Sequence, residues 1–174
     1  MSLFSIFYYL LLSFIYILAI PYLIFKSKNQ KYKQAIPAKF FLKNNSKFNT
    51  NGIWFHSCSM GETKAIKSLL EYYKDEANVS VITNTGFEEG KKITKNVRYL
   101  PFEIFLPFWI NKQKVLVVME AELWYMLFLC AKNKGAKTFL INARISDRSY
   151  SSYKKFSFFY KRIFKNIDKV FAQS

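Results

Sequence analysis

The segment His56–Glu62, with the sequence HSCSMGE, combines a carboxylate with two hydroxyls and a glycine. Its S-x-x-E spacing is that of a capping box, in which Ser59 begins a helix and Glu62 bonds back to the Ser59 amide. Gly61 would let the chain turn tightly into that helix. Alternatively Glu62, exposed at a strand end, is a general base that takes a proton from a substrate hydroxyl. Spacing leaves both roles open.

Two further carboxylates, Glu120 and Glu122, follow an apolar run in the sequence MEAELW. Paired carboxylates at one site can divide acid and base work between them. The same two residues could instead be acids in the first turn of a helix, where they complement the helix dipole. The pattern does not decide between these roles.

The segment NARISDRS carries two arginines, Arg144 and Arg148, whose guanidinium groups could bind phosphate. Arg148 could equally pair with Asp147 or lie in solvent. The segment TNTG (Thr83–Gly86) offers hydroxyls, including that of Thr85, and one glycine. These segments are therefore candidates for contacts with a phosphorylated ligand.

Short apolar runs alternating with helical patterns must position these residues. The predicted strands are Ile53–His56, Val79–Thr83, Val97–Leu100, Val115–Met119, Thr138–Ile141 and Lys169–Ala172. The predicted helices are Glu62–Lys74, Phe87–Lys95, Phe102–Ile110, Leu123–Lys134 and Ser151–Lys165. This alternation predicts an α/β fold with a parallel sheet. In such a sheet ligands bind at the carboxyl ends of the strands, where the segments above lie.

The 174 residues carry a formal net charge of +16, which is unevenly distributed. Residues 26–50 contain seven lysines and no acid, and residues 149–174 contain six basic residues and one aspartate. A basic surface suits anionic lipid, phosphorylated substrates or nucleic acid. We expect no nucleic-acid partner, because neither a basic recognition helix nor an aromatic-rich RNA motif is present.

Cysteine and histidine usage argues against a metal centre. The two cysteines, Cys58 and Cys130, are far apart, and the single histidine, His56, cannot build a metal site by itself. Reduced thiols in the cytoplasm fit this pattern. We expect no metal and no cofactor.

Residues 3–25 contain no charge and would form a helix roughly 35 Å long at about 1.5 Å per residue, enough to cross a membrane. A cleaved signal peptide would want basic residues before this run, whereas Lys26 and Lys28 come after it. A helix lying flat in the membrane would need a polar face, and the run reads as having none. The lysines predict a cytoplasmic location for the domain that follows.

Three parts are therefore expected along the chain. Residues 1–25 are a membrane anchor, residues 26–51 a basic juxtamembrane connector with one short amphipathic helix, and residues 52–174 a Rossmann-like domain. Membrane lipids are expected partners of the anchor and connector.

In their order and spacing, the segments HSCSMGE, ITNTGFEEG, YLPFE, VVMEAELW, INARISDRSYSSY and FAQS resemble the N-terminal half of the 3-deoxy-D-manno-octulosonic acid (Kdo) transferases of lipopolysaccharide synthesis. The resemblance covers nearly the whole chain. This sequence departs from the family pattern at Ala121, where a hydroxyl residue is usual, and at Asn84-Thr85-Gly86, where the family has a Thr-Pro-Thr-Gly-like sequence. Neither departure removes an ionisable group.

The resemblance implies the N-terminal domain of a GT-B glycosyltransferase, which binds a lipid A precursor (lipid IVA), while a C-terminal domain binds the donor CMP-Kdo. Glu62 matches the family's general base. The residues implied on the acceptor side are Ser59, Gly61, Thr85, Glu120, Glu122, Arg144 and Arg148, with the lysines from Lys31 to Lys47 as further phosphate ligands. No metal is implied, and the location implied is the inner membrane.

Family members are roughly twice as long, so the resemblance also implies that the donor-binding domain is absent from these residues. One domain cannot orient both substrates, and orientation supplies much of the rate. We therefore expect this truncated chain to be inactive alone. The alternative is a non-catalytic, membrane-tethered module that binds anionic phosphoglycolipid.

Overall fold

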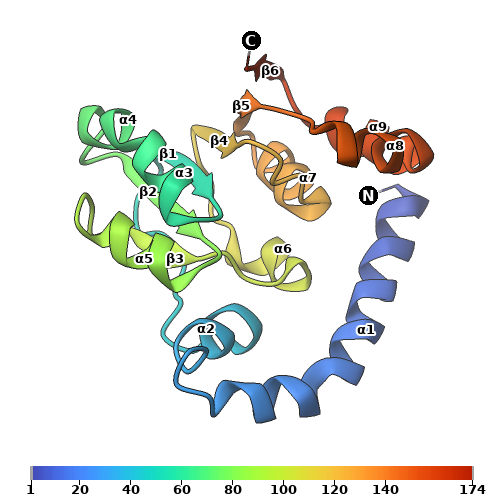
Figure 1. The fold of residues 1–174 in the computed structure, drawn as a ribbon, viewed down its shortest axis with the longest axis horizontal. Helices are drawn as coiled ribbons and strands as arrows, with labels where there is room; N and C mark the ends of the chain where they lie inside the picture. The colour runs from blue at the N-terminus through green and yellow to red at the C-terminus, as the bar shows by residue number, and fades with distance from the viewer. Residues whose placement is uncertain (1, 174) are drawn as a thin grey trace.

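The computed structural model describes residues 2–173 (Figure 1). Two residues lie outside the described residues. They are Met1, the first residue of the predicted anchor, and Ser174, the last residue of the predicted domain and of the segment FAQS. A single sheet contains six strands: β1 (Ile53–Ser57), β2 (Ala77–Val81), β3 (Val97–Tyr99), β4 (Val115–Met119), β5 (Lys137–Ala143) and β6 (Lys169–Ala172). Their order is β3-β2-β1-β4-β5-β6, and every neighbouring pair is parallel. The predicted α/β, Rossmann-like parallel sheet is confirmed.

The helices are α1 (Leu3–Ser27), α2 (Ala35–Phe41), α3 (Met60–Ala65), α4 (Lys67–Tyr72), α5 (Asn84–Lys91), α6 (Leu106–Trp109), α7 (Tyr125–Asn133), α8 (Asp147–Lys155) and α9 (Ser157–Phe164), with a 3-10 turn η1 (Glu103–Phe105). The single helices predicted over Glu62–Lys74 and Ser151–Lys165 are each two helices. The backbone leaves the helical region at Ile66 (ψ 7°) and Phe156 (ψ 27°), which interrupts them.

The second strand begins and ends two residues earlier than predicted. Thr83, predicted in the strand, is the N-cap of α5, and its side chain accepts a hydrogen bond from the Gly86 amide. The amides of Ile82 and Thr83 both donate to the carbonyl of Cys58. These two residues therefore join the loop after β1 instead of extending the ladder with β3.

The two faces of the sheet contribute to separate apolar clusters, because successive strand side chains point to opposite faces. Trp54 faces a cluster with α6, α7 and Ile163 of α9, whereas Phe55 faces a cluster with Leu70 of α4. In both clusters the strand residues are almost fully buried. The strand ends thus rest on a rigid layer of packed side chains.

The predicted anchor is the helix α1, which alone among the described residues has the length and composition to cross a membrane. It continues six residues past Pro21, and it bends in its C-terminal part (Figure 1). The expectation that this segment has no polar face is wrong. Ser5, Tyr8 and Tyr16 point hydroxyls at the domain.

The connector contains the short helix expected for it, α2. Ala35, Ile36 and Ala38 of this helix are buried, and Phe48 further along packs against Trp54 and Trp109. The connector is thereby packed into the domain and does not hang free of it.

Candidate functional site

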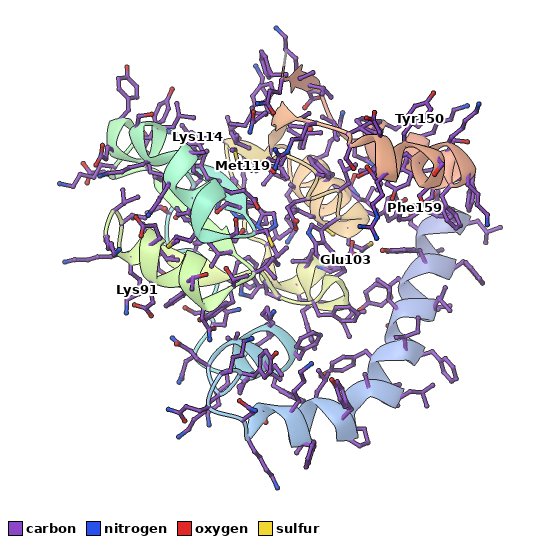
Figure 2. The ribbon with its side chains drawn as sticks, in the orientation of Figure 1. Lys91, Glu103, Lys114, Met119, Tyr150 and Phe159 are labelled. Atoms are coloured by element: carbon purple, nitrogen blue, oxygen red, sulfur yellow. The ribbon has the colours of Figure 1, made fainter. Side chains whose placement is uncertain are left out.

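The site is built where the strand order reverses, between β1 and β4. Chain connections leave β1 and β4 toward opposite sides of the sheet at such a point, which opens a crevice outside the carboxyl ends of the strands. The loop after β1 carries Glu62 and the loop after β4 carries Glu122. The sheet therefore brings two predicted site segments to one place. Met119, the last residue of β4, is labelled in Figure 2.

Glu62 is held by the loop that precedes its helix. Ser59 is the N-cap of α3 and accepts a hydrogen bond from the Glu62 amide at 3.4 Å. The Glu62 carboxylate accepts from the Cys58 amide at 2.7 Å and from the Ser59 hydroxyl at 3.1 Å. The predicted bond to the Ser59 amide is thus wrong, because the carboxylate reaches one residue further back. Glu62 is half-buried in this position.

Glu122 is held from the other side by His56 and Trp124. The Trp124 indole donates to its carboxylate at 2.7 Å, and His56 Nε2 lies 3.8 Å away. Burial would raise the pKa of Glu122, but its contacts with His56, Trp124 and Cys58 outweigh burial and lower it. Glu122 is therefore an anion at neutral pH.

His56 is fully buried in β1, and hydrogen bonds hold its ring through one nitrogen. Nδ1 lies 2.8 Å from the Ser80 hydroxyl and 3.1 Å from the Ser80 carbonyl. Nε2 has no hydrogen-bond partner among the described residues and faces Glu122. No sequence pattern links these two residues, because only the strand order places β1 beside β4.

Cys58 lies between the two glutamates. Burial, and then the Glu122 and Glu62 carboxylates, raise the pKa of its thiol to about 12. At neutral pH it is a protonated thiol and a poor nucleophile. The chemistry of the site therefore belongs to the carboxylates. We name Cys58, Glu62, Glu122 and His56 the strand-end cluster.

Glu120 stands beside the cluster and links the loops after β4 and β5. Its carboxylate pairs with Arg144 at 2.8 Å and accepts from the Asn142 amide group at 3.4 Å. Glu120 and Asn142 both have left-handed backbones, with φ of 53° and 52°. This conformation costs non-glycine residues of order 1 kcal/mol and is concentrated at functional sites. The predicted phosphate ligand Arg144 is thus already paired with a carboxylate.

Arg148 lies in the first turn of α8 and is exposed. It forms no ion pair within residues 2–173, and the alternative pairing with Asp147 is not formed. The structure thus provides no bond that joins Arg148 to the strand-end cluster.

Gly61 lies in the first turn of α3 and does not have a left-handed backbone, so the entry into the helix does not depend on the conformational freedom of glycine. A Cβ at this position would meet only the Ser59 hydroxyl, at 3.9 Å. Gly86, in contrast, packs so closely on the loop after β1 that a Cβ would lie 3.3 Å from the Cys58 carbonyl oxygen. Gly61 therefore leaves open space beside Ser59, whereas Gly86 holds α5 against the loop.

A pocket of about 490 Å³ opens beside this loop and contains Thr85 in its lining. Two lysines from the connector, Lys31 and Lys39, contribute to the same lining. The Lys39 ammonium donates to the Ile82 carbonyl at 3.2 Å, and burial lowers its pKa. The lysine-rich composition of the connector signalled a basic surface, but only the docking of α2 singles out Lys39.

Among residues 2–173, no three His, Cys, Asp or Glu side chains are grouped as metal ligands. The arrangement at the strand ends offers two anchored carboxylates, an open space beside Ser59, and a lysine-lined pocket. It can accept a proton from a hydroxyl and hold an anionic group nearby.

Comparisons with known proteins give the relatives of this chain. Residues 28–174 match the family described as 3-Deoxy-D-manno-octulosonic-acid transferase (kdotransferase). A 3-deoxy-D-manno-octulosonic acid transferase from Chlamydia pneumoniae is 30% identical over 94% of this chain and 40% of its own length. One from Rickettsia felis is 32% identical over 70% of this chain and 29% of its own.

A bifunctional glycosyltransferase/methyltransferase from Fusobacterium nucleatum is 33% identical over 70% of this chain and 21% of its own length. The matches thus span between a fifth and two fifths of these relatives. No solved structure matches the chain. With a family match over residues 28–174 and these relatives, the chain belongs to the Kdo transferase family of glycosyltransferases.

Proposed function

We propose that these residues form the acceptor-binding half of an enzyme that transfers Kdo from CMP-Kdo to the lipid A precursor lipid IVA. The observation that carries the proposal is the position of Glu62, a half-buried carboxylate anchored at the switch point of the sheet. Membership of the family supports the reaction class.

In this proposal Glu62 is the general base. It takes the proton from an acceptor sugar hydroxyl while the hydroxyl oxygen attacks the anomeric carbon of Kdo. The bond from that carbon to the CMP phosphate breaks, CMP leaves with the electron pair, and the anomeric configuration inverts. The step uses no metal and no cofactor.

The hydrogen bonds that cap α3 are compatible with this role. Each carboxylate oxygen of Glu62 accepts one bond from the loop, and each has a second lone pair. The Cys58 amide and the Ser59 hydroxyl orient the carboxylate, so that a lone pair is free for the acceptor hydroxyl. The same arrangement of Glu62 can therefore cap α3 and act as the general base.

The acceptor's phosphates would be held by cations around this point. Lys31 and Lys39 line the pocket next to Thr85, and Arg144 would exchange its bond to Glu120 for a phosphate oxygen. Glu122 and Glu120 would shape the acceptor side of the cleft. Arg148, which is free of ion pairs within residues 2–173, would contact a phosphate only at the edge.

We place the protein at the inner membrane, with the domain on the cytoplasmic face and α1 in contact with lipid. The apolar composition of α1 and the lysines that follow it support this location. The lipid acceptor would then lie in the membrane that α1 binds.

The test is Glu62→Gln in a chimera that joins this chain to the C-terminal part of the Chlamydia pneumoniae relative. Glutamine keeps an oxygen for the Cys58 amide but cannot act as the base, so transfer should fall by about 10²–10⁴-fold. Glu88→Gln, an exposed change on α5, is the matched control. Near-normal transfer by a folded Glu62→Gln enzyme would reject the base assignment.

The proposal also expects residues 1–174 alone to bind lipid IVA without transferring Kdo, because the donor would be oriented by a second domain. Transfer assays on the chain and on the chimera, run side by side with a lipid IVA binding assay, check this. Binding by both with transfer by neither would favour the non-catalytic, membrane-tethered module.

A further inference from the structure

One face of α1 is turned toward the domain along its whole length. The residues that are fully or partly buried recur every three or four positions, as one side of a helix must. From the start of the helix as far as Leu23 they are Phe4, Ser5, Tyr8, Tyr9, Leu12, Ser13, Tyr16, Ala19, Ile20 and Leu23. Among them, Ser5 is 1% exposed and Leu23 is 7% exposed. This face is covered by protein.

Hydroxyl groups on this face bind three separate elements of the domain, namely α7, η1 and α2. Ser5 lies 2.7 Å from the Tyr125 hydroxyl of α7, and Tyr8 donates to Glu103 of η1 at 2.6 Å. The Tyr9 hydroxyl donates to the Ile104 carbonyl at 3.0 Å, and the Tyr16 hydroxyl donates to the Phe40 carbonyl of α2 at 2.6 Å. These bonds run over about 16 Å of helix at about 1.5 Å per residue.

Glu103 is an ionisable residue in one of the elements under α1. It is 4% exposed, burial raises its pKa, and it accepts from the Met126 amide at 2.6 Å as well as from Tyr8. Figure 2 labels it beside α6. A helix that crossed the membrane in this docked state would carry η1, α2 and the start of α7 into the bilayer with it. Ionisable groups and irregular backbone are costly there.

The opposite face of α1 is exposed and entirely apolar apart from Tyr22. Its members are Leu3, Ile6, Phe7, Leu10, Leu11, Phe14, Ile15, Ile17, Leu18, Tyr22, Ile24 and Phe25. Phe7 is 63% exposed and Leu18 is 65% exposed. A soluble monomer rarely exposes so large a continuous apolar surface.

Cations stand at both ends of this apolar face. At the N-terminal end the Arg162 guanidinium lies 4.4 Å from the centre of the Phe4 ring, and Phe159 packs on the same ring. The neighbouring α8 and α9 expose Phe156, Phe158 and five basic residues between Arg148 and Arg162. At the C-terminal end, Lys26 lies over Tyr22 and Tyr32. Basic residues that border an apolar strip fit anionic headgroups above acyl chains.

We propose that α1 lies in the plane of the membrane, with its exposed face among the acyl chains of one phospholipid leaflet and its hydroxyl face fixed on the domain. The surface extends onto α8 and α9 through Phe156 and Phe158. The helix is then a built-in part of the domain surface and not a stalk. This inference rests on the docking of α1 and is independent of Kdo transfer.

Topology provides the first test, with single cysteines introduced in the full chain after Cys58→Ser and Cys130→Ala. Cysteines at Ser2→Cys and Ser152→Cys are probed with a membrane-impermeant maleimide in sealed vesicles containing phosphatidylethanolamine and phosphatidylglycerol. An in-plane helix leaves both positions on the same side of the bilayer. Labelling on opposite sides would overturn the proposal.

Cross-linking in the same vesicles provides the second test. Phe4→Cys and Phe159→Cys should be joined by a short bismaleimide, because their native rings lie 6.3 Å apart. Phe14→Cys, on the exposed face of α1, paired with Phe159→Cys is the matched control and should give no product. Absence of the first product in the membrane would show that α1 leaves the domain, and would reject the proposal.

Flotation with the vesicles tests whether lipid covers the apolar face of α1. Phe14→Asp with Leu18→Asp should reduce vesicle binding at least about tenfold, because a buried acid is costly among acyl chains. Tyr72→Asp, at an 80% exposed aromatic on α4, should change nothing. A chain that fails to float and instead forms a dimer through α1 would assign the apolar face to a second copy and overturn the proposal.

Discussion

Glu62 and Glu103 each accept a hydrogen bond from a backbone amide, but their surroundings differ. Glu103 is buried under α1, and the Tyr8 hydroxyl and the Met126 amide occupy its two oxygens. Glu62 is half-buried at the strand ends. A carboxylate closed in by protein serves the fold, whereas one that keeps an open side can serve a ligand. This difference separates a docking residue from a candidate base.

The largest effect is expected at the docking carboxylate. Glu103→Ala leaves the Tyr8 hydroxyl and the Met126 amide without a partner, at about 1–3 kcal/mol for each buried group. Urea unfolding should therefore show a loss of about 2–6 kcal/mol. Glu103→Gln keeps an acceptor and should stay close to the parent. Equal losses in both variants would mean that the charge of Glu103, and not its bonding, stabilises α1.

A smaller effect is expected within the strand-end cluster. The Glu122 carboxylate helps to raise the pKa of Cys58 to about 12, so Glu122→Gln should lower it. Each unit by which the pKa falls increases the thiolate fraction about tenfold, and alkylation at fixed pH should accelerate accordingly. Glu120→Gln is the control, because Glu120 is not among the groups that shift Cys58. An unchanged rate in Glu122→Gln would place Cys58 outside the influence of that carboxylate.

Gly61→Ala tests whether the space next to Ser59 is used by the acceptor. The added methyl meets only the Ser59 hydroxyl at 3.9 Å, and alanine favours the helix, so stability should rise by about 0.5–1 kcal/mol. If the space holds the acceptor, lipid IVA binding by the same variant should weaken. Thermal unfolding and a binding assay on one preparation measure both. Unweakened binding would show that the acceptor does not use this space.

The smallest expected effect is on the pH dependence of stability. The pKa of Glu103 is raised above its ordinary 4.5, so the folded state holds a proton that the unfolded state has lost. Stability should therefore fall as pH rises from about 4.5 through the folded pKa of Glu103. Glu122, whose pKa is lowered, acts in the opposite direction, and its contribution is lost as pH falls through its folded pKa. The difference between parent and Glu103→Gln isolates the Glu103 contribution.

Periodicity and strand-end logic were sufficient to predict the sheet and to select the segments that form the site. The strand β4 was predicted to the residue, because an apolar run between polar residues has unambiguous ends. The pairing of His56 with Glu122 could not be predicted, because it depends on β4 lying next to β1.

The polar face of α1 cannot be recognised from the sequence for a different reason. Tyrosine and serine are common in apolar helices, so a row of their hydroxyls at helical spacing does not by itself indicate a polar face. Only the acceptors that bind these hydroxyls show that they form a contact surface. These acceptors are Glu103 and the carbonyls of Ile104 and Phe40. The sequence predicts that the Glu62 side chain caps the helix, but its hydrogen bond from the Cys58 amide depends on local backbone geometry.

The docking of α1 also has a consequence for the order of events during synthesis. Ser5 bonds to Tyr125, which is 120 residues further along the chain. At about 5–20 residues per second the ribosome needs roughly 6–24 s to make the partner of a helix that it has already released. During that interval Ser5 has no partner, whereas Tyr16 can already bind the Phe40 carbonyl, which lies 24 residues further along the chain. In the in-plane arrangement proposed above, the apolar face of α1 would contact lipid before Tyr125 is made, and the rest of the domain would then assemble onto a helix at the membrane.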